Sequence, residues 1–240
     1  MSQKITPIEH DKFYHIYNQA VSSENIFREK ENYLYFLKLY DKYIEPIAET
    51  FAWCLMPNHF HFLVRIKEEN EISFIPRVSK KEPLSGHKAA DRDVSAKTPS
   101  AVKKPDGGFI TQKGGLLITP DRKYNPSNQF SHLFNSYTQA YNKSYNRSGT
   151  LFKRPFKRIW VDNEKYYKNL VIYINNNPVH HEFVENTIEY PWTSYLTIVS
   201  DKPTKLKRQE VINWFDDKEN FIFLHNKEDT DLELEKYFLE

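Results

Sequence analysis

The chain has 240 residues, of which 39% are hydrophobic and 28% charged, and its net charge is +2. This length allows one domain with a substantial core or two small domains, and the composition excludes a wholly disordered chain. The single cysteine, Cys54, excludes an intramolecular disulfide and a thiolate zinc cluster. No apolar run is long enough to span a membrane and the first residues lack a signal-peptide core, so we expect a cytoplasmic protein with no membrane partner.

The first 66 residues predict one helix and three strands. Residues 13–18 alternate and are rich in aromatic and β-branched side chains, which is typical of a strand. Apolar residues at three- and four-residue steps predict a helix over residues 22–44. Residues 50–56 and 59–66 predict two further strands, paired across a tight Pro-Asn turn.

The composition changes after this third strand. Residues 77–118 cluster Lys, Ser, Pro, Asp and Gly and have almost no aliphatic periodicity. Such a segment buries too little apolar area to offset the entropy lost on ordering. We therefore expect a flexible insertion within one domain, residues 1–200, because the elements that follow complete the same fold.

Those elements are a helix over residues 127–145, a strand over 156–161 and a helix over 163–176 that ends before Pro178. The order β-α-β-β-α-β predicts an α+β fold, with a ferredoxin-like sheet and helices on one face. A short segment follows at residues 192–198. Residues 201–240 are expected to form an acidic C-terminal extension with helical character.

The sharpest local feature is the pair His59 and His61 in the predicted third strand. Side chains alternate along a strand, so both imidazoles share a face with Leu63 and Arg65, while the intervening residues are apolar and should face the core. Same-face neighbours lie about 7 Å apart, which lets two ring nitrogens converge on one metal ion. The same pattern also fits two hydrogen-bonded histidines without a metal.

A second feature is the pair Tyr173 and Asn177 in the last predicted helix. A four-residue separation places a phenol and an amide oxygen on one helix face, one turn apart. An amphipathic helix more often uses such a tyrosine in its core, and an asparagine before a proline is an ordinary helix end. Spacing alone leaves both interpretations open.

Charge is distributed unevenly along the chain. Residues 137–168 contain eight Lys and Arg against two acids, whereas residues 210–240 contain ten acids against three lysines. A basic segment with interleaved aromatics predicts contact with nucleic acid, although a solvated helix face has the same composition. The candidate DNA-binding residues are Arg147, Phe152, Lys153, Arg154, Lys157 and Arg158.

Four motifs in this order resemble the single-tyrosine HUH transposases, and the nearest branch is similar to the REP-associated tyrosine transposases. They are Met-Pro-Asn-His-Phe-His-Phe-Leu-Val from Met56, the basic segment from Arg147, Tyr-Ile-x-x-Asn-Pro-Val from Tyr173, and Tyr-Pro-Trp-Thr-Ser-Tyr from Tyr190. The resemblance covers residues 10–200 and is interrupted by the insertion. The acidic extension has no counterpart in it.

The resemblance implies roles for four residues. His59 and His61 correspond to the histidine pair that binds Mg²⁺ or Mn²⁺, and Asn177 to the position of a third ligand. Tyr173 corresponds to the nucleophile that cuts single-stranded or hairpin DNA, which leaves a 5′-phosphotyrosine and a free 3′-hydroxyl. Such enzymes then rejoin the strand to another end, in some cases as homodimers.

The chemistry explains why these groups are needed. A phosphodiester is anionic, so a bound divalent cation must withdraw charge from it. A covalent phosphotyrosine conserves the bond energy, which permits rejoining without ATP. Two alternatives stay open: a nucleic-acid-binding protein on the same fold without catalysis, and a metal phosphoesterase that uses water.

Overall fold

The computed structural model describes residues 6–22, 24–72, 78–80, 111–113, 116–118 and 124–227. The chain divides into two compact units, Met1–Ile72 with Asn125–Glu240, and Ser73–Tyr124. None of the helices in these described ranges combines the length and hydropathy that crossing a bilayer requires.

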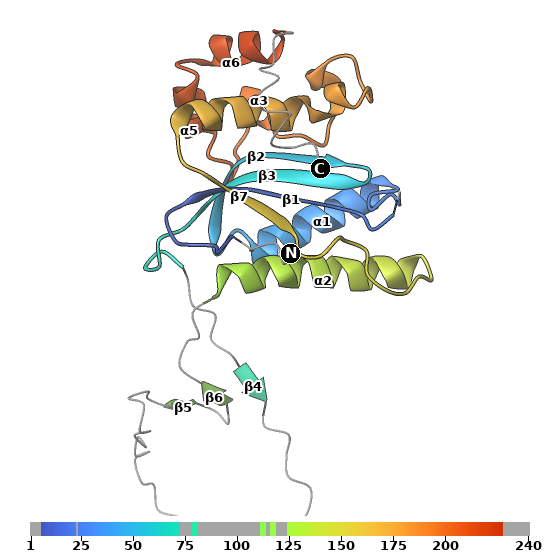
Figure 1. Cartoon of the computed structure of the whole chain (residues 1–240). Helices are drawn as coiled ribbons and strands as arrows, with labels where there is room; N and C mark the ends of the chain where they lie inside the picture. The colour runs from blue at the N-terminus through green and yellow to red at the C-terminus, as the bar shows by residue number, and fades with distance from the viewer. Residues whose placement is uncertain are drawn as a thin grey trace, which may run out of the picture. The chain divides into compact units, whose positions relative to one another are not determined.

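The first unit is built on a four-stranded antiparallel sheet in the order β2-β3-β1-β7 (Figure 1). This is the ferredoxin-like arrangement predicted from the order of the elements, and the α+β class is confirmed. The strands begin and end within two residues of their predicted bounds. The elements of this β-α-β-β-α-β core are β1 (Phe13–Gln19), α1 (Lys30–Tyr43), β2 (Ala48–Met56), β3 (His59–Ile66), α2 (Pro126–Ser144) and β7 (Lys157–Val161).

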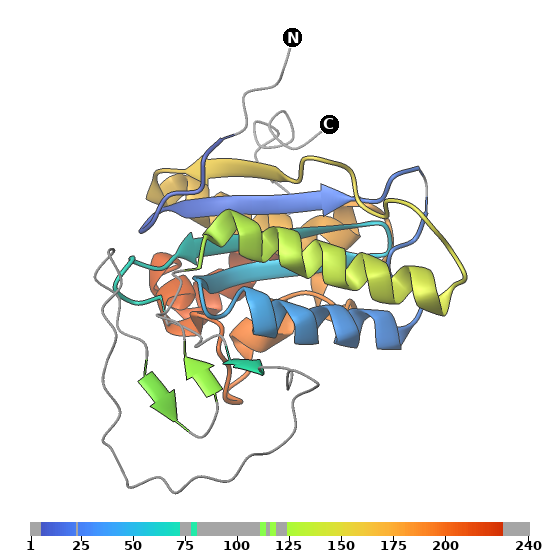
Figure 2. The same cartoon turned by 90° about the horizontal axis from the view of Figure 1, so that it is seen from below.

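Helices α1 and α2 lie side by side on one face of the sheet (Figure 2). The apolar side chains of β3 point toward them: the Phe60 ring is 5.3 Å from that of Phe36, and the Phe62 ring is 4.4 Å from that of Tyr40. Phe134 on α2 also contacts Phe60. The predicted core face of this strand is therefore confirmed.

The opposite face of the sheet is covered as well, which the prediction of helices on one face did not include. Helices α3 (Glu164–His180) and α5 (Arg208–Trp214) lie over it, and α6 (Lys218–His225) packs against α3 (Figure 1). A second apolar core fills this layer. Its members include Phe51, Leu63, Val171, Ile174, Val211, Phe215 and Phe221. The face that carries His59 and His61 is thus buried rather than open.

Helix α1 begins at Lys30, so the prediction of a helix from residue 22 was wrong at its start. Ser22 has a left-handed backbone conformation with φ of 64°. Ile26 and Phe27 are buried in an irregular segment, where the Phe27 amide donates to the Pro57 carbonyl at 2.9 Å. This irregular segment therefore packs against the β2–β3 turn instead of forming the first turns of the helix.

Helix α3 continues to His180, so the prediction that it ends before Pro178 was also wrong. A proline inside a helix removes one backbone hydrogen bond, but packing on both sides of α3 maintains the helical path. The next amides resume the pattern, since the His181 amide donates to the Asn177 carbonyl at 3.1 Å. Asn177 consequently has a helical backbone, one turn after Tyr173.

A group of buried polar side chains, which we call the anchor cluster, attaches α3 to the segments that follow it. Asn175 lies 3.1 Å from His225 Nε2 through its amide nitrogen and accepts from the Ser194 hydroxyl at 2.6 Å. Asn176 donates to the His225 carbonyl at 2.9 Å and accepts from Thr187. The cluster joins η1 (Thr187–Glu189), α4 (Tyr195–Val199) and α6 to one side of α3.

The segment between η1 and α4 runs along the outer edge of β2. The Leu55 amide donates to the Trp192 carbonyl and the Ser194 amide donates to the Trp53 carbonyl, at 2.9 and 2.8 Å. Thr193 forms an antiparallel bridge with Cys54. The Tyr-Pro-Trp-Thr-Ser-Tyr motif thus supplies a short additional strand-like contact to the sheet.

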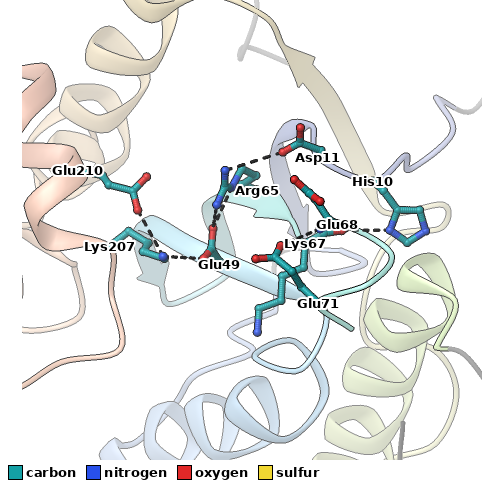
Figure 3. Close-up of polar contacts among 9 residues, drawn as sticks. All are labelled: His10, Asp11, Glu49, Arg65, Lys67, Glu68, Glu71, Lys207 and Glu210. Atoms are coloured by element: carbon teal, nitrogen blue, oxygen red, sulfur yellow. Dashed lines mark hydrogen bonds and ion pairs between the residues drawn. The ribbon is translucent and has the colours of Figure 1, made fainter. Parts of the chain in front are cut away.

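The first part of the C-terminal extension is tied to the sheet by ion pairs (Figure 3). Glu49 on β2 binds Arg65 on β3, and its other oxygen lies 2.5 Å from Lys207 Nζ, next to α5. Lys207 also pairs with Glu210 at 3.3 Å. Burial opposes ionisation of Glu49, but the hydrogen bonds from Lys207 and Arg65 outweigh it and lower its pKa. Residues 228–240 of the extension lie outside the described residues.

The second unit contains a three-stranded sheet in the order β4-β6-β5, with antiparallel pairing. Its strands are β4 (Val78–Lys80), β5 (Thr111–Lys113) and β6 (Leu116–Ile118). The remainder of the predicted insertion at residues 77–118 lies outside the described residues, and its flexibility stays a prediction.

Candidate functional site

The histidine pair lies at the beginning of β3, directly after the Pro57-Asn58 turn. Alternation along the strand turns both rings toward α3, and their centroids are 5.2 Å apart. His61 is only 5% exposed, whereas His59 is half-buried at the rim of a cavity. The register of the sheet places Tyr17 of β1 beside His61, and these two rings are stacked at 5.7 Å.

Helix α3 brings the other two candidate residues to the same place. Asn177 is fully buried, and its Oδ1 lies 2.8 Å from His59 Nε2. Tyr173, one turn earlier, packs edge-on against His61 with ring centroids 5.6 Å apart. Residues from distant parts of the sequence, a strand and a helix, therefore lie around one point. The spacing arguments predicted only that the members of each pair share a face.

Each imidazole of the pair has an outer partner on its Nδ1 atom. His59 Nδ1 lies 2.7 Å from Asn58 Oδ1, and His61 Nδ1 lies 2.9 Å from Nε2 of the fully buried His15. In the tautomer with the proton on Nδ1, these contacts are hydrogen bonds and both Nε2 atoms present lone pairs. Fixing the metal-binding nitrogen through a hydrogen bond on the other ring nitrogen is the usual arrangement of histidine ligands. We call His15, Asn58, His59, His61 and Asn177 the site cluster.

All three histidines of the site cluster are held in the neutral form. Burial lowers the pKa of His59 to about 4, against the hydrogen bond to Asn177, which raises it. Burial lowers the pKa of His15 to about 3 and that of His61 well below its ordinary value, and the neighbouring histidines add to the effect on His61. Neutral imidazole is the form that binds metal ions.

A cavity of about 420 Å³ opens beside these groups. His59, His61 and Tyr173 line it together with Lys153 and Lys157. Two of the candidate DNA-binding lysines therefore border the same space as the candidate nucleophile, where they place positive charge next to an incoming phosphate.

The cluster fits a Mg²⁺ or Mn²⁺ ion. Ligand atoms about 2.1 Å from such an ion, at right angles, lie about 3 Å apart, close to the separation of His59 Nε2 and Asn177 Oδ1. Without a cation, His59 with its proton on Nε2 donates a hydrogen bond to Asn177 Oδ1. Within the described residues, no three His, Cys, Asp or Glu side chains are grouped to hold a metal. A third protein ligand beside the two histidines would here be an amide oxygen. Asn177 supplies one, and its Nδ2 has no hydrogen-bond partner in the same ranges.

Two of the candidate DNA-binding residues stabilise the fold through contacts with other side chains. Phe152 is only 4% exposed and packs against Phe60, Phe134 and Tyr137, so the prediction that it stacks on unpaired bases was wrong. Arg147 forms an ion pair with Glu24 at 2.8 Å and donates to Asn142 Oδ1 and to the Thr150 carbonyl, which stabilises the turn after α2. Both residues support the fold around the basic segment.

The sequence analysis missed His15, Asn58 and His181. His181, directly after α3, packs its ring 5.0 Å from that of His59 and lines the cavity. His15 lies among aromatic and aliphatic residues in β1. A titratable residue among such neighbours was the signal in the sequence that could have indicated a role at the site. The sequence predicts Asn58 only as part of a tight turn, because the contact of its side chain with His59 depends on the side-chain rotamer.

Comparison with protein-family models gives no match, and comparison with curated proteins gives none either. Among solved structures, this chain is similar to a REP-associated tyrosine transposase bound to a REP hairpin, with a TM-score of 0.51 and 14% sequence identity. The similarity covers 85% of this chain and 89% of that one. At this identity it shows a shared fold.

Proposed function

We propose that this protein cuts and rejoins single-stranded DNA through a phosphotyrosine intermediate. The observation that carries the proposal is that Tyr173 contacts His61 where both line one cavity, and that the buried Asn177 contacts His59, which lines the same cavity. All of these residues come from one chain, so the proposed site is complete within a single protomer.

His59, His61 and Asn177 would hold Mg²⁺ or Mn²⁺, which would polarise the scissile phosphate and stabilise the charge that develops on it. The protein's own contribution is to fix the ligands before DNA arrives. Asn58 and His15 orient the two imidazoles, and burial keeps them unprotonated. Lys153 and Lys157 border the cavity and would hold the phosphates on either side of the scissile bond.

Tyr173 would attack the phosphorus through its phenolic oxygen. The new bond joins that oxygen to phosphorus, the bond from phosphorus to the 3′ oxygen breaks, and the phenolic proton is transferred so that a 3′-hydroxyl leaves. Attack of a 3′-hydroxyl on the phosphotyrosine reverses the exchange and restores the phenol. Since the number of phosphodiester bonds is conserved, no ATP is required.

The choice of DNA rests on the shared fold. The similar transposase is described as bound to a REP hairpin. We propose that the substrate here is also a single strand containing a hairpin, and that the protein belongs to the same branch of single-tyrosine transposases.

A denaturing-gel assay tests the proposal. The protein is incubated with Mn²⁺ and labelled single strands that contain hairpins, and then denatured. Wild-type protein should carry covalent label, and Tyr173→Phe should carry none. The matched control is Tyr167→Phe, because Tyr167 lies on the same helix but packs against Phe13 and Trp214. This control should retain the label.

His59→Ala should abolish cleavage and leave DNA binding in EDTA largely intact. Cleavage without covalent label would replace the proposal with a phosphoesterase that uses water. Binding without cleavage, at every hairpin tested, would replace it with a binding protein on the same fold.

A further inference from the structure

A second cavity, of about 500 Å³, lies between α2 and the segment that leads into β7. We call it the α2 cleft and define it by Ser127, Ser131, Asn135, Lys153, Arg154 and Arg158. The three α2 residues recur at four-residue steps, so they form one polar stripe along the helix that faces the three cations. Pockets of this size commonly accommodate small ligands.

The cations of the α2 cleft differ from others in this unit because they lack acidic partners. Arg147, Lys168 and Lys205 each pair with a carboxylate. Within the described ranges, Lys153, Arg154 and Arg158 form no ion pair, and no acidic side chain lines the cleft. Uncompensated positive charge in a concave site favours an anion.

Arg158 gives the strongest indication of a missing ligand. Its guanidinium lies 4.3 Å above the Phe156 ring, and Nη1 donates to Ser127 Oγ at 3.1 Å. Its Nε is buried and has no acceptor among the described residues. A buried donor without a partner is costly, whereas a charge-assisted bond to a phosphate oxygen would compensate it.

The α2 cleft adjoins the cavity beside the site cluster. Asn18, Lys153 and Pro155 line both. An anion in the cleft is therefore close to the candidate cleavage site, as the next phosphate of a polymer would be. Phe134 and Phe156 contribute an apolar wall to the cleft.

We propose that the α2 cleft is a second nucleotide subsite, which binds a phosphodiester of the same DNA single strand next to the cleaved one. This inference rests on the proposed function for the identity of the polymer. The cleft itself is defined by residues outside the metal site, so its role can be tested without catalysis.

The test compares two variants that each add one negative charge to α2. Ser131→Glu places a carboxylate in the cleft, whereas Gln139→Glu places one on an exposed position of the same helix. Binding of a labelled single strand is measured by fluorescence anisotropy in EDTA, where no chemistry occurs. Ser131→Glu should weaken binding at least about tenfold, and Gln139→Glu less than about twofold.

Arg158→Gln provides an independent measurement in case Ser131→Glu fails to fold. It should reduce the slope of log affinity against log salt by about 0.7, the value for one phosphate contact to a single strand. Lys143→Gln, an exposed charge on α2, should leave the slope unchanged. Equal effects of the cleft and control variants would overturn the subsite.

Two competitors identify the ligand. A duplex of the same sequence should bind more weakly, and its binding should not respond to Ser131→Glu. Inorganic phosphate should compete no better than chloride at equal ionic strength. Efficient competition by phosphate would instead identify a site for a free anion and overturn the proposal. If Ser131→Glu loses DNA binding while the wild-type protein also shows no DNA cleavage, the result would support the subsite and contradict the proposed cleavage chemistry.

Discussion

Helix α3 contributes asparagines to two buried polar clusters of similar composition. The clusters differ in whether the amide groups of these asparagines all have hydrogen-bond partners. In the anchor cluster, His225 Nδ1 contacts the Phe221 carbonyl at 2.7 Å, its Nε2 faces Asn175, and Asn175 accepts from Ser194. In the site cluster, Asn177 is equally buried but its Nδ2 has no partner among the described residues. One asparagine completes a structural network, and the other is the ligand that we propose for a metal ion.

The difference shows what burial alone cannot tell. Burial lowers the pKa of His225 and of His59 to about 4 in both cases. A depressed pKa therefore does not distinguish a structural histidine from a candidate ligand. The difference between the clusters lies in the asparagines: the Asn177 amide nitrogen has no partner among the described residues, whereas that of Asn175 contacts His225.

The largest effect, a loss of Mn²⁺ affinity, is expected from removing the Asn177 side chain. Asn177→Ala removes a proposed metal ligand, so Mn²⁺ affinity measured by calorimetry should fall at least about 100-fold. The unfolding free energy without metal should fall less than in Asn175→Ala, since the Asn177 side chain has one hydrogen-bond contact, with His59. A large loss of stability at unchanged Mn²⁺ affinity would assign Asn177 to the fold and break the comparison.

A smaller effect on the metal is expected from His15, which acts through His61. His15→Ala removes the acceptor for the His61 ring and should weaken Mn²⁺ binding about 10- to 100-fold. His15→Gln, whose amide oxygen can accept the same hydrogen bond, should restore part of the affinity. Equal affinities for the two variants would mean that His15 contributes only by filling space.

On the other side of the helix, Asn175→Ala should change stability instead of metal binding. It leaves His225 Nε2 and the Ser194 hydroxyl without their partner, which should lower the unfolding free energy in urea by about 2 kcal/mol. Mn²⁺ affinity of the folded protein should stay within about twofold of wild type. A tenfold loss of affinity would show that the two clusters are coupled through α3.

The smallest difference between the two clusters is expected in the pH dependence of the unfolding free energy. Because the folded-state pKa of His225 is about 4 and the ordinary value is 6.5, the unfolded chain takes up the proton first. The unfolding free energy should fall as pH decreases from about 6.5 to about 4, by up to about 1.4 kcal/mol per pH unit for each such group.

Without metal, replacing a histidine in either cluster should reduce the dependence of the unfolding free energy on pH by a similar amount. The reason is that burial is the main cause of the lowered pKa in both clusters. His225→Gln and His59→Gln are each expected to remove one such contribution. Added Mn²⁺ should raise the unfolding free energy of His225→Gln and leave that of His59→Gln unchanged. Stabilisation of both variants by Mn²⁺ would place the ion elsewhere.

The sequence predicted the elements that follow a simple period, and it failed where tertiary contacts override a local rule. Alternation in β3 correctly assigned Phe60 and Phe62 to the core, and the four-residue spacing placed Tyr173 and Asn177 together. Pro178 was expected to end α3, but packing on two sides maintains the helix. The partner of His61 could not be predicted, because it comes from the register between β1 and β3.

The contact between residues 192–194 and β2 limits how two copies of this protein can associate. An exposed strand edge offers free amides and carbonyls to a neighbouring molecule, which leads to strand exchange or aggregation. Here the outer edge of β2 is already occupied by the chain's own backbone. A homodimer formed by extending the sheet would first have to displace this segment, and with it the Ser194 hydroxyl that supports α3. Association through that edge at residues 53–55 would therefore require this segment to move.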